Sequence, residues 1–315
     1  MWRQPEFGTE FGLRLVVLAA RLFGRGGAGV ILRVVAFYYT VFAGAVRRAA
    51  QDYRRRMGLD SGFWGAYRNI LAFSVCALDR VLLVRGETRR FVVTSHGVEH
   101  LERLRDEGRG AILLGAHVGS FEAMRAFAKD RSFAINILAY FNNARIINGF
   151  LATVGSDFRE RVIEIDTSDT SYIFAAQEAI EAGEFVAVLG DRVGINEKTA
   201  TAQFFGSPAR FPTGPFTLAA LLRCPVYLTF GLYRGANHYE LFCEPLVEHL
   251  ELPRGDREAV LAAQVQRYAE RLEHYCRLAP DNWFNFFDFW AGPARTDEST
   301  RSGPSEQVQS REPAA

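Results

Sequence analysis

Hydrophobic and polar residues alternate with two different periods along most of the chain. Short apolar runs are typical of buried strands, whereas apolar positions three and four residues apart are typical of amphipathic helices. The predicted strands are 89–95, 111–116, 133–139, 162–165, 184–190 and 225–233. The predicted helices are 61–84, 97–108, 119–130, 144–154, 169–182, 215–223 and 256–278.

Strands that alternate with helices imply a largely parallel sheet covered by helices. Residues 238–245 are expected to add an antiparallel strand. The predicted fold class is therefore α/β, a mostly parallel mixed sheet flanked by helices, with membrane-associating helices at the N-terminus. The predicted domain organisation is an N-terminal segment (1–60), an α/β domain (61–293) and a polar tail (294–315) expected to be disordered.

The N-terminal segment is apolar and rich in arginine. Residues 11–23 and 28–46 read as apolar helices, but the uninterrupted apolar run from Val34 to Val46 is shorter than the roughly 20 residues that span a bilayer. Aromatic and aliphatic residues flanked by arginine suit a helix that lies in the headgroup region. A single span and a helix packed on the core remain alternatives.

Composition narrows the class of protein. The formal net charge of the whole chain is only +1, which gives no sign of a nucleic-acid partner, although residues 1–60 carry ten arginines against four acidic residues. The four cysteines are scattered without a CxxC pair, which favours a reducing compartment over a disulfide framework. No cleavable signal peptide is expected from the polar start of the chain.

The apolar run "AILLGA" (111–116) leads directly into His117, at the edge of the sheet where open α/β folds place ligands. Glu122 falls in the first turn of the following helix, where it is able to reach the imidazole and fix its tautomer. The backbone N–H groups of Gly119 and Ser120 are expected to face a substrate anion. The structural alternative is that His117 is a hydrogen-bonded core histidine and that Glu122 complements the helix dipole. These residues alone favour neither the catalytic nor the structural interpretation.

This stretch resembles the His-x4-Asp/Glu block of the lysophospholipid acyltransferase superfamily, in its branch of bacterial lipid A lauroyl and myristoyl acyltransferases. The resemblance extends over "GVEHLERLRDEGRGAILLGAH" (97–117), "VLGDRVG" (188–194), "FFGSPARFPTGPFTLAALLRCPV" (204–226) and "PDNWFNFFDFW" (280–290). The resemblance as a whole covers roughly residues 5–292, and the combination of blocks is far more specific than the histidine block alone.

The resemblance implies an O-acyltransferase. A fatty acyl chain would move from a thioester of acyl carrier protein or coenzyme A to a hydroxyl of a lipid or glycolipid acceptor. His117 would be the general base and Glu122 its partner. No acyl-enzyme, metal or redox cofactor is implied, in keeping with the absence of a G-x-S-x-G motif. The resemblance also implies a bacterial protein at the cytoplasmic face of the inner membrane, which we expect to be a monomer.

Further polar residues are candidates for substrate binding. Asp191 and Arg192 match the later polar block of the family, where Arg192 would bind an anionic group of the acceptor or the oxyanion; a strand-end ion pair is the structural alternative. Weaker candidates are Asn142 and Arg145, which follow another predicted strand, and Arg210, which is equally compatible with a solvated loop. Thr213 is expected to cap a helix that begins at Pro215.

Two readings compete with acyl transfer. The segment "HGVEH" (96–100) is a literal match to the H-x-x-E-H signature of inverted zinc peptidases, but Gly97 suggests that His96 precedes the helix. A protein that binds acyl chains without turnover is the other alternative. The dense aromatic residues of 283–290 suit core packing, an acyl-chain lining or a membrane interface.

Overall fold

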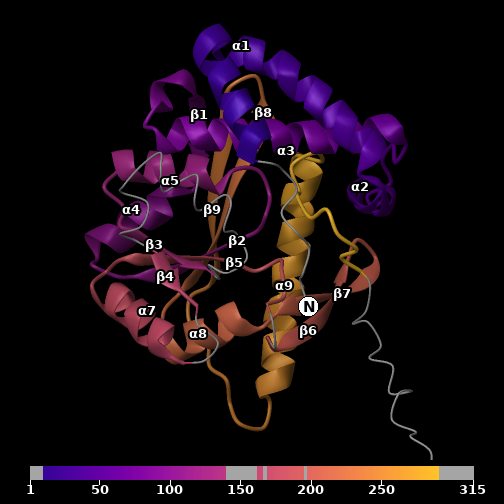
Figure 1. The fold of residues 1–315 in the computed structure, drawn as a ribbon. Helices are drawn as coiled ribbons and strands as arrows, with labels where there is room; N and C mark the ends of the chain where they lie inside the picture. Colours follow the sequence, from indigo (N-terminus) through magenta and orange to yellow (C-terminus); the bar gives the residue numbers. More distant parts are fainter. Residues whose placement is uncertain (1–9, 140–161, 166–168, 195–196, 291–315) are drawn as a thin grey trace, which may run out of the picture.

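The structure, a computed structural model, describes residues 10–139, 162–165, 169–194 and 197–290 (Figure 1). Its main sheet has seven strands in the order β1-β9-β8-β2-β5-β3-β4. These strands are β1 (Val92–His96), β2 (Ala111–Gly115), β3 (Ile135–Ala139), β4 (Val162–Glu164), β5 (Phe185–Leu189), β8 (Val226–Gly235) and β9 (His238–Val247). The pairs β2–β5, β2–β8, β3–β5, β3–β4 and β1–β9 are parallel, and β9 runs antiparallel to β8. The predicted mostly parallel mixed sheet and its antiparallel addition are confirmed.

Helices cover both faces of the sheet. In the α/β part these are α4 (Val98–Asp106), α5 (Phe121–Asp130), α7 (Ser171–Glu181), α8 (Gly214–Leu222) and α9 (Arg257–Leu278). Along β2, Ala111 and Leu113 pack with α4 and α5, while Ile112 and Leu114 pack with the core shared by α7, α8 and α9. This alternation follows from the two-residue period of a strand. The helix predicted over 144–154 lies outside the described residues.

A short hairpin was not anticipated by the sequence pattern. Strands β6 (Thr199–Phe204) and β7 (Ser207–Pro212) pair antiparallel around a two-residue turn and form a separate small sheet. The turn residues Phe205 and Gly206 both have positive φ angles, +50° and +71°. Thr213 precedes α8 as expected, but its hydroxyl bonds the carbonyl of Lys198 and caps no helix N–H.

Three helices form the N-terminal part: α1 (Glu10–Phe42), α2 (Gly44–Arg56) and α3 (Phe63–Val84). They lie together at one end of the molecule (Figure 1). In place of two predicted apolar helices, one helix, α1, runs to Phe42 and meets α2 at a sharp bend. A short 3-10 turn (Thr88–Arg90) then leads from α3 into β1.

In the C-terminal half of α1, several large apolar side chains are exposed to solvent. Val34 and Phe42 are 65% and 71% exposed, and Phe37 and Tyr38 are also exposed. Among the described helices, none alone has the length and hydropathy to cross a bilayer; Gly26–Phe42 and Gly44–Arg56 reach those values only as a pair, across a 93° bend. The predicted association of these helices with a membrane therefore remains a prediction.

Helix α2 packs against the C-terminal part of the α/β domain. Tyr53 of α2 is buried and contacts the ring of Trp283, with ring centroids 4.9 Å apart. Arg54, 3% exposed, forms an ion pair with Asp281. Helix α3 reaches the same loop, because Asn69 donates hydrogen bonds to the backbone carbonyls of Asp281 and Trp283. The loop after α9 is thus fixed from the N-terminal side of the molecule.

Candidate active site

Sheet register places His117 beside Asp191. Gly115, the last residue of β2, pairs with Leu189, the last residue of β5, and the two strands are adjacent and parallel. His117 and Asp191 each follow their strand end by two residues, so both emerge at the same edge of the sheet. His117 Nδ1 lies 2.8 Å from Asp191 Oδ1. The arrangement is that of a histidine–carboxylate pair at the carboxyl end of the strands.

The Asp191 carboxylate is completely buried and surrounded by donors. Besides the His117 ring, three groups donate to Oδ2: the backbone N–H of His117 at 3.0 Å, Trp283 Nε1 at 3.0 Å and Asn285 Nδ2 at 2.8 Å. A buried carboxylate is stable only when it is hydrogen-bonded in this way. Because an ionised carboxylate accepts only, His117 carries its proton on Nδ1, and Nε2 is left with a lone pair that is able to act as a base.

The loop after α9 closes over this pair. The Phe284 N–H donates to the His117 carbonyl at 2.8 Å, and the Gly119 N–H donates to the Asn282 carbonyl at 2.8 Å. Trp283, 1% exposed, packs in the main core. The aromatic segment that the sequence left open between core packing and lipid contact therefore belongs largely to the core, and it also supplies two donors to Asp191. The sequence did not predict that Trp283 and Asn285 donate hydrogen bonds to Asp191.

Arg192 is tied to the same loop. Its Nε donates to Asn285 Oδ1 at 2.7 Å and its guanidinium also donates to the Phe284 carbonyl at 3.0 Å. The guanidinium carbon lies 5.9 Å from the centre of the Phe287 ring. The Arg192 cation is thereby held close enough to lower the pKa of both His117 and Asp191. Asp191 and Arg192 were predicted to bind substrate. In the structure Asp191 is the partner of His117, and Arg192 is the residue next to it.

The expected pairing of Glu122 with His117 differs from the structure. Glu122 Oε1 lies 2.7 Å from Arg80 Nε of α3, and this ion pair is mostly buried. The Nδ1 position of His117 is taken by Asp191, because the β2–β5 register brings a carboxylate there from another strand. Glu122 instead fixes a second cation near the imidazole, and Arg80 lowers the pKa of His117.

The N–H groups of Gly119 and Ser120 are not directed at a substrate, contrary to expectation. The Gly119 N–H bonds the Asn282 carbonyl, and the Ser120 N–H bonds the Gly231 carbonyl of β8 at 2.8 Å. Gly119 has φ +67°, and a Cβ there would lie 2.0 Å from the Gly231 oxygen, so glycine is required for this close approach. The buried Ser120 hydroxyl accepts a hydrogen bond from the Ala123 N–H and begins α5.

The remaining predicted site residues are placed as follows. Arg210 lies on β7 and donates to the Thr199 hydroxyl on β6, so its described partner belongs to the hairpin. Asn142 and Arg145 lie outside the described residues.

Electrostatics favours a neutral imidazole next to a charged carboxylate. Burial and the cations of Arg192 and Arg80 lower the pKa of His117 below its ordinary value, against the opposing effect of Asp191. Burial alone would raise the pKa of Asp191, but its interactions with His117 and Arg192 hold it at about 2. Burial lowers the pKa of Arg192 to about 10, which leaves it charged at neutral pH. The pair is therefore poised for general-base chemistry.

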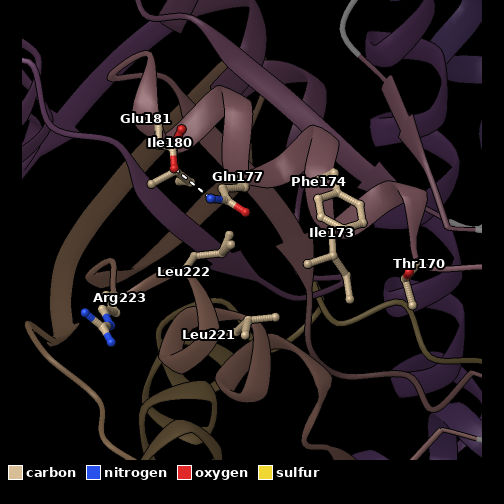
Figure 2. Close-up of a pocket in the computed structure, with 9 residues that line it drawn as sticks. All are labelled: Thr170, Ile173, Phe174, Gln177, Ile180, Glu181, Leu221, Leu222 and Arg223. Carbon is tan, nitrogen blue, oxygen red and sulfur yellow. Dashed lines mark hydrogen bonds between the residues drawn. The ribbon is translucent and has the colours of Figure 1, made fainter.

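A narrow apolar cavity of about 70 Å³ lies under α5, the helix that follows His117. Its lining includes Phe121 and Met124 of α5, Leu113 of β2 and Thr229 of β8. A wider groove of about 580 Å³ lies between α7 and α8 (Figure 2). Neither space is lined by a described partner of His117 or Asp191. The cavity shares α5 with the segment that follows His117, whereas the groove is lined by α7, α8 and the residues next to them.

The geometry around "HGVEH" does not match a zinc peptidase. His96 ends β1, Gly97 has φ +76°, and α4 begins only at Val98, so the two histidines do not share one helix. Their rings contact different aromatic residues, Phe242 for His96 and Tyr227 for His100. Within the described ranges no three histidine, cysteine or acidic side chains cluster as metal ligands would.

Comparison with known proteins assigns the chain to a family. A family model described as bacterial lipid A biosynthesis acyltransferase matches residues 75–291, over two thirds of the chain. The match includes the whole main sheet, His117, Asp191, Arg192 and the loop after α9. A search of curated proteins finds no match. The chain belongs to the bacterial lipid A biosynthesis acyltransferase family, and is by that membership an acyltransferase.

Proposed function

We propose that this chain transfers a fatty acyl group from an acyl thioester to a hydroxyl of a lipid or glycolipid acceptor, with His117 as general base and Asp191 as its partner. Family membership supports the reaction class and the need for an acyl donor and a lipid acceptor. The single observation that carries the mechanism is the hydrogen bond between His117 Nδ1 and the fully buried carboxylate of Asp191.

In this mechanism the acceptor hydroxyl attacks the thioester carbonyl carbon while His117 Nε2 takes its proton. The C–S bond then breaks, and the imidazolium returns the proton to the departing thiolate. Asp191 stabilises the imidazolium without taking the proton, since its pKa of about 2 keeps it ionised. Arg192 is the candidate that stabilises the negative charge on the carbonyl oxygen or binds an anionic group of the acceptor.

Direct transfer fits the chemistry of the cysteines. All four are buried, and burial raises the pKa of the Cys224 thiol to about 11 and that of the Cys243 thiol to about 12. Thiols of this kind are poor nucleophiles at neutral pH. We therefore propose no acyl-cysteine intermediate, and the proposed transfer uses no metal or redox cofactor.

The acyl chain is proposed to enter the cavity under α5. This cavity is lined mainly by apolar side chains, and α5 begins four residues after His117. Its volume is well below the roughly 300–1,000 Å³ of typical ligand sites, so the side chains of Phe121 and Met124 must move to admit a chain. The donor is acyl carrier protein or coenzyme A.

The exposed apolar face of α1 is proposed to rest in the cytoplasmic surface of the bacterial inner membrane. Exposed arginines, Arg33 on α1 and Arg48 on α2, accompany the apolar side chains, and such neighbours suit anionic headgroups. This placement would bring a lipid acceptor to the same end of the molecule as α3, which contacts both Glu122 and the loop after α9.

The test is release of free thiol from acyl-coenzyme A and acyl carrier protein thioesters, measured with lipid A precursors, other glycolipids and phospholipids as acceptors. We expect acceptor-dependent release in the wild type and a loss of about 10³-fold or more in His117→Gln. His249→Gln is the matched control, because His249 is exposed and its described partner is Glu251. Equal turnover by wild type and His117→Gln would favour the alternative, a lipid-binding protein without this catalysis.

A further inference from the structure

Asn285 stands between the anion and the cation of the site. It is 4% exposed and lies in the loop after α9. Its Nδ2 donates to Asp191 Oδ2 at 2.8 Å, and its Oδ1 accepts from Arg192 Nε at 2.7 Å. The orientation of the amide is fixed by its partners: the reverse orientation would set oxygen against carboxylate and NH₂ against guanidinium.

The backbone around Asn285 is held as firmly as its side chain. The preceding residue, Phe284, donates its N–H to the His117 carbonyl and accepts a hydrogen bond from Arg192 through its own carbonyl. The Phe284 N–H, the Phe284 carbonyl and the Asn285 side chain are therefore all directed at residues of the proposed site. Such second-layer hydrogen bonds fix the orientation of the groups that react.

The position of the amide also determines how Asp191 shares its two oxygens. A guanidinium binds a carboxylate best in a two-pronged pair that uses both oxygens. Asn285 occupies Oδ2 together with Trp283 Nε1 and the His117 N–H, and it engages Arg192 Nε through its own oxygen. Oδ1 is thereby kept for His117 Nδ1.

We propose that Asn285 is a positioning residue, which holds Asp191 Oδ1 toward His117 and keeps the Arg192 guanidinium from taking that oxygen. The inference rests on the proposed function, since it assigns a role within that reaction. Asn285 touches no reacting atom and acts through Asp191 and Arg192.

The test measures the titration of His117 directly, by NMR of protein with labelled histidine, with the resonance assigned from His117→Gln. The charged groups acting on His117 are Asp191, Arg192 and Arg80, and Glu122 is paired with Arg80. In Asn285→Asp a second carboxylate faces Arg192 and Asp191. We expect the pKa of His117 to rise by about one unit, because the added negative charge offsets the Arg192 cation.

Asn282→Asp is the matched control. Asn282 is equally buried in the same loop, but its side chain bonds only the backbone of Tyr233 among the described residues. The same chemical change there is expected to lower thermal stability and leave the pKa of His117 in place. If both variants shift that pKa equally, or neither shifts it, Asn285 has a structural role only and the proposal is overturned.

Turnover gives the second measurement. In Asn285→Ala we expect kcat for acyl transfer to fall by about 10- to 100-fold with KM for the thioester nearly unchanged. An increase in KM for the thioester with kcat unchanged would contradict a positioning role. The proposed function fails separately, if the wild type releases no thiol with any acceptor, and the titration of His117 still decides the role of Asn285 in that case.

Discussion

Replacing Asp191 with asparagine changes the charge of the residue while keeping its shape. Three donors converge on Asp191 Oδ2: the backbone N–H of His117, Trp283 Nε1 and Asn285 Nδ2. In Asp191→Asn the amide oxygen must take this place, since an NH₂ group there would face three donors. The new NH₂ group then points at His117 Nδ1.

This inversion disables the base. His117 Nδ1 must now accept a hydrogen bond, so its proton moves to Nε2, the atom that we propose deprotonates the acceptor hydroxyl. A tautomer inversion of this kind in a histidine–carboxylate pair costs about 10³–10⁴-fold in kcat, or about 4–5.5 kcal/mol of activation free energy. We expect kcat to fall by that factor while the variant remains folded, because all three donors on Oδ2 keep an acceptor.

The assay compares thiol release by Asp191→Asn and Glu122→Gln, with thermal melting to confirm folding. Glu122 forms an ion pair with Arg80, and the Arg80 cation lowers the pKa of His117. Its variant is therefore expected to lose at least tenfold less activity than Asp191→Asn. If Glu122→Gln proves the more damaging change, the assignment of Asp191 as the partner of His117 is refuted.

Three further outcomes are expected. The acid limb of the pH profile of kcat/KM should lie below pH 6.5, with activity rising as His117 loses its proton; a limb at or above pH 7 would contradict the lowered pKa. Gly119→Ala should lower the free energy of unfolding, measured by chemical denaturation, by more than about 2 kcal/mol. Gly58→Ala is the control, because Gly58 also has a positive φ but a Cβ there would meet no neighbour. Equal losses in the two variants would show that the close approach of Gly119 to Gly231 is unimportant. The double variant Val34→Ser, Phe42→Ser should co-sediment less with anionic lipid vesicles than the wild type does. Unchanged co-sedimentation would exclude this face of α1 as the membrane-contact surface.

The sheet was predictable because its strands carry strong local patterns. The runs that form β2 and β5 are continuously apolar, and β8 is mainly apolar apart from Thr229 and its last residues, which is typical of strands covered on both faces. The β6–β7 hairpin was missed because its turn is Phe205–Gly206, and a phenylalanine with positive φ is no hairpin signal in sequence. That turn depends on packing that no local pattern records.

Only part of the candidate site could be named from the sequence, and its contacts could not. His117, Asp191 and Arg192 were all identified, yet the partner of the histidine was sought five residues away on the same segment. The contact with Asp191 depends on which strands are neighbours, and strand order is a long-range property. A usable signal was that both residues directly follow a predicted buried strand, 111–116 for His117 and 184–190 for Asp191.

The loop after α9 has a consequence for biosynthesis. A nascent chain that has been translated as far as α9 already contains His117, Asp191 and every strand of the main sheet. It lacks the indole and amide donors that Asp191 receives from Trp283 and Asn285, and the carbonyl that receives the Gly119 N–H. The proposed catalytic centre is thus completed only after the loop that follows α9 has been synthesised, and we expect a chain terminated at α9 to show no acceptor-dependent release of thiol.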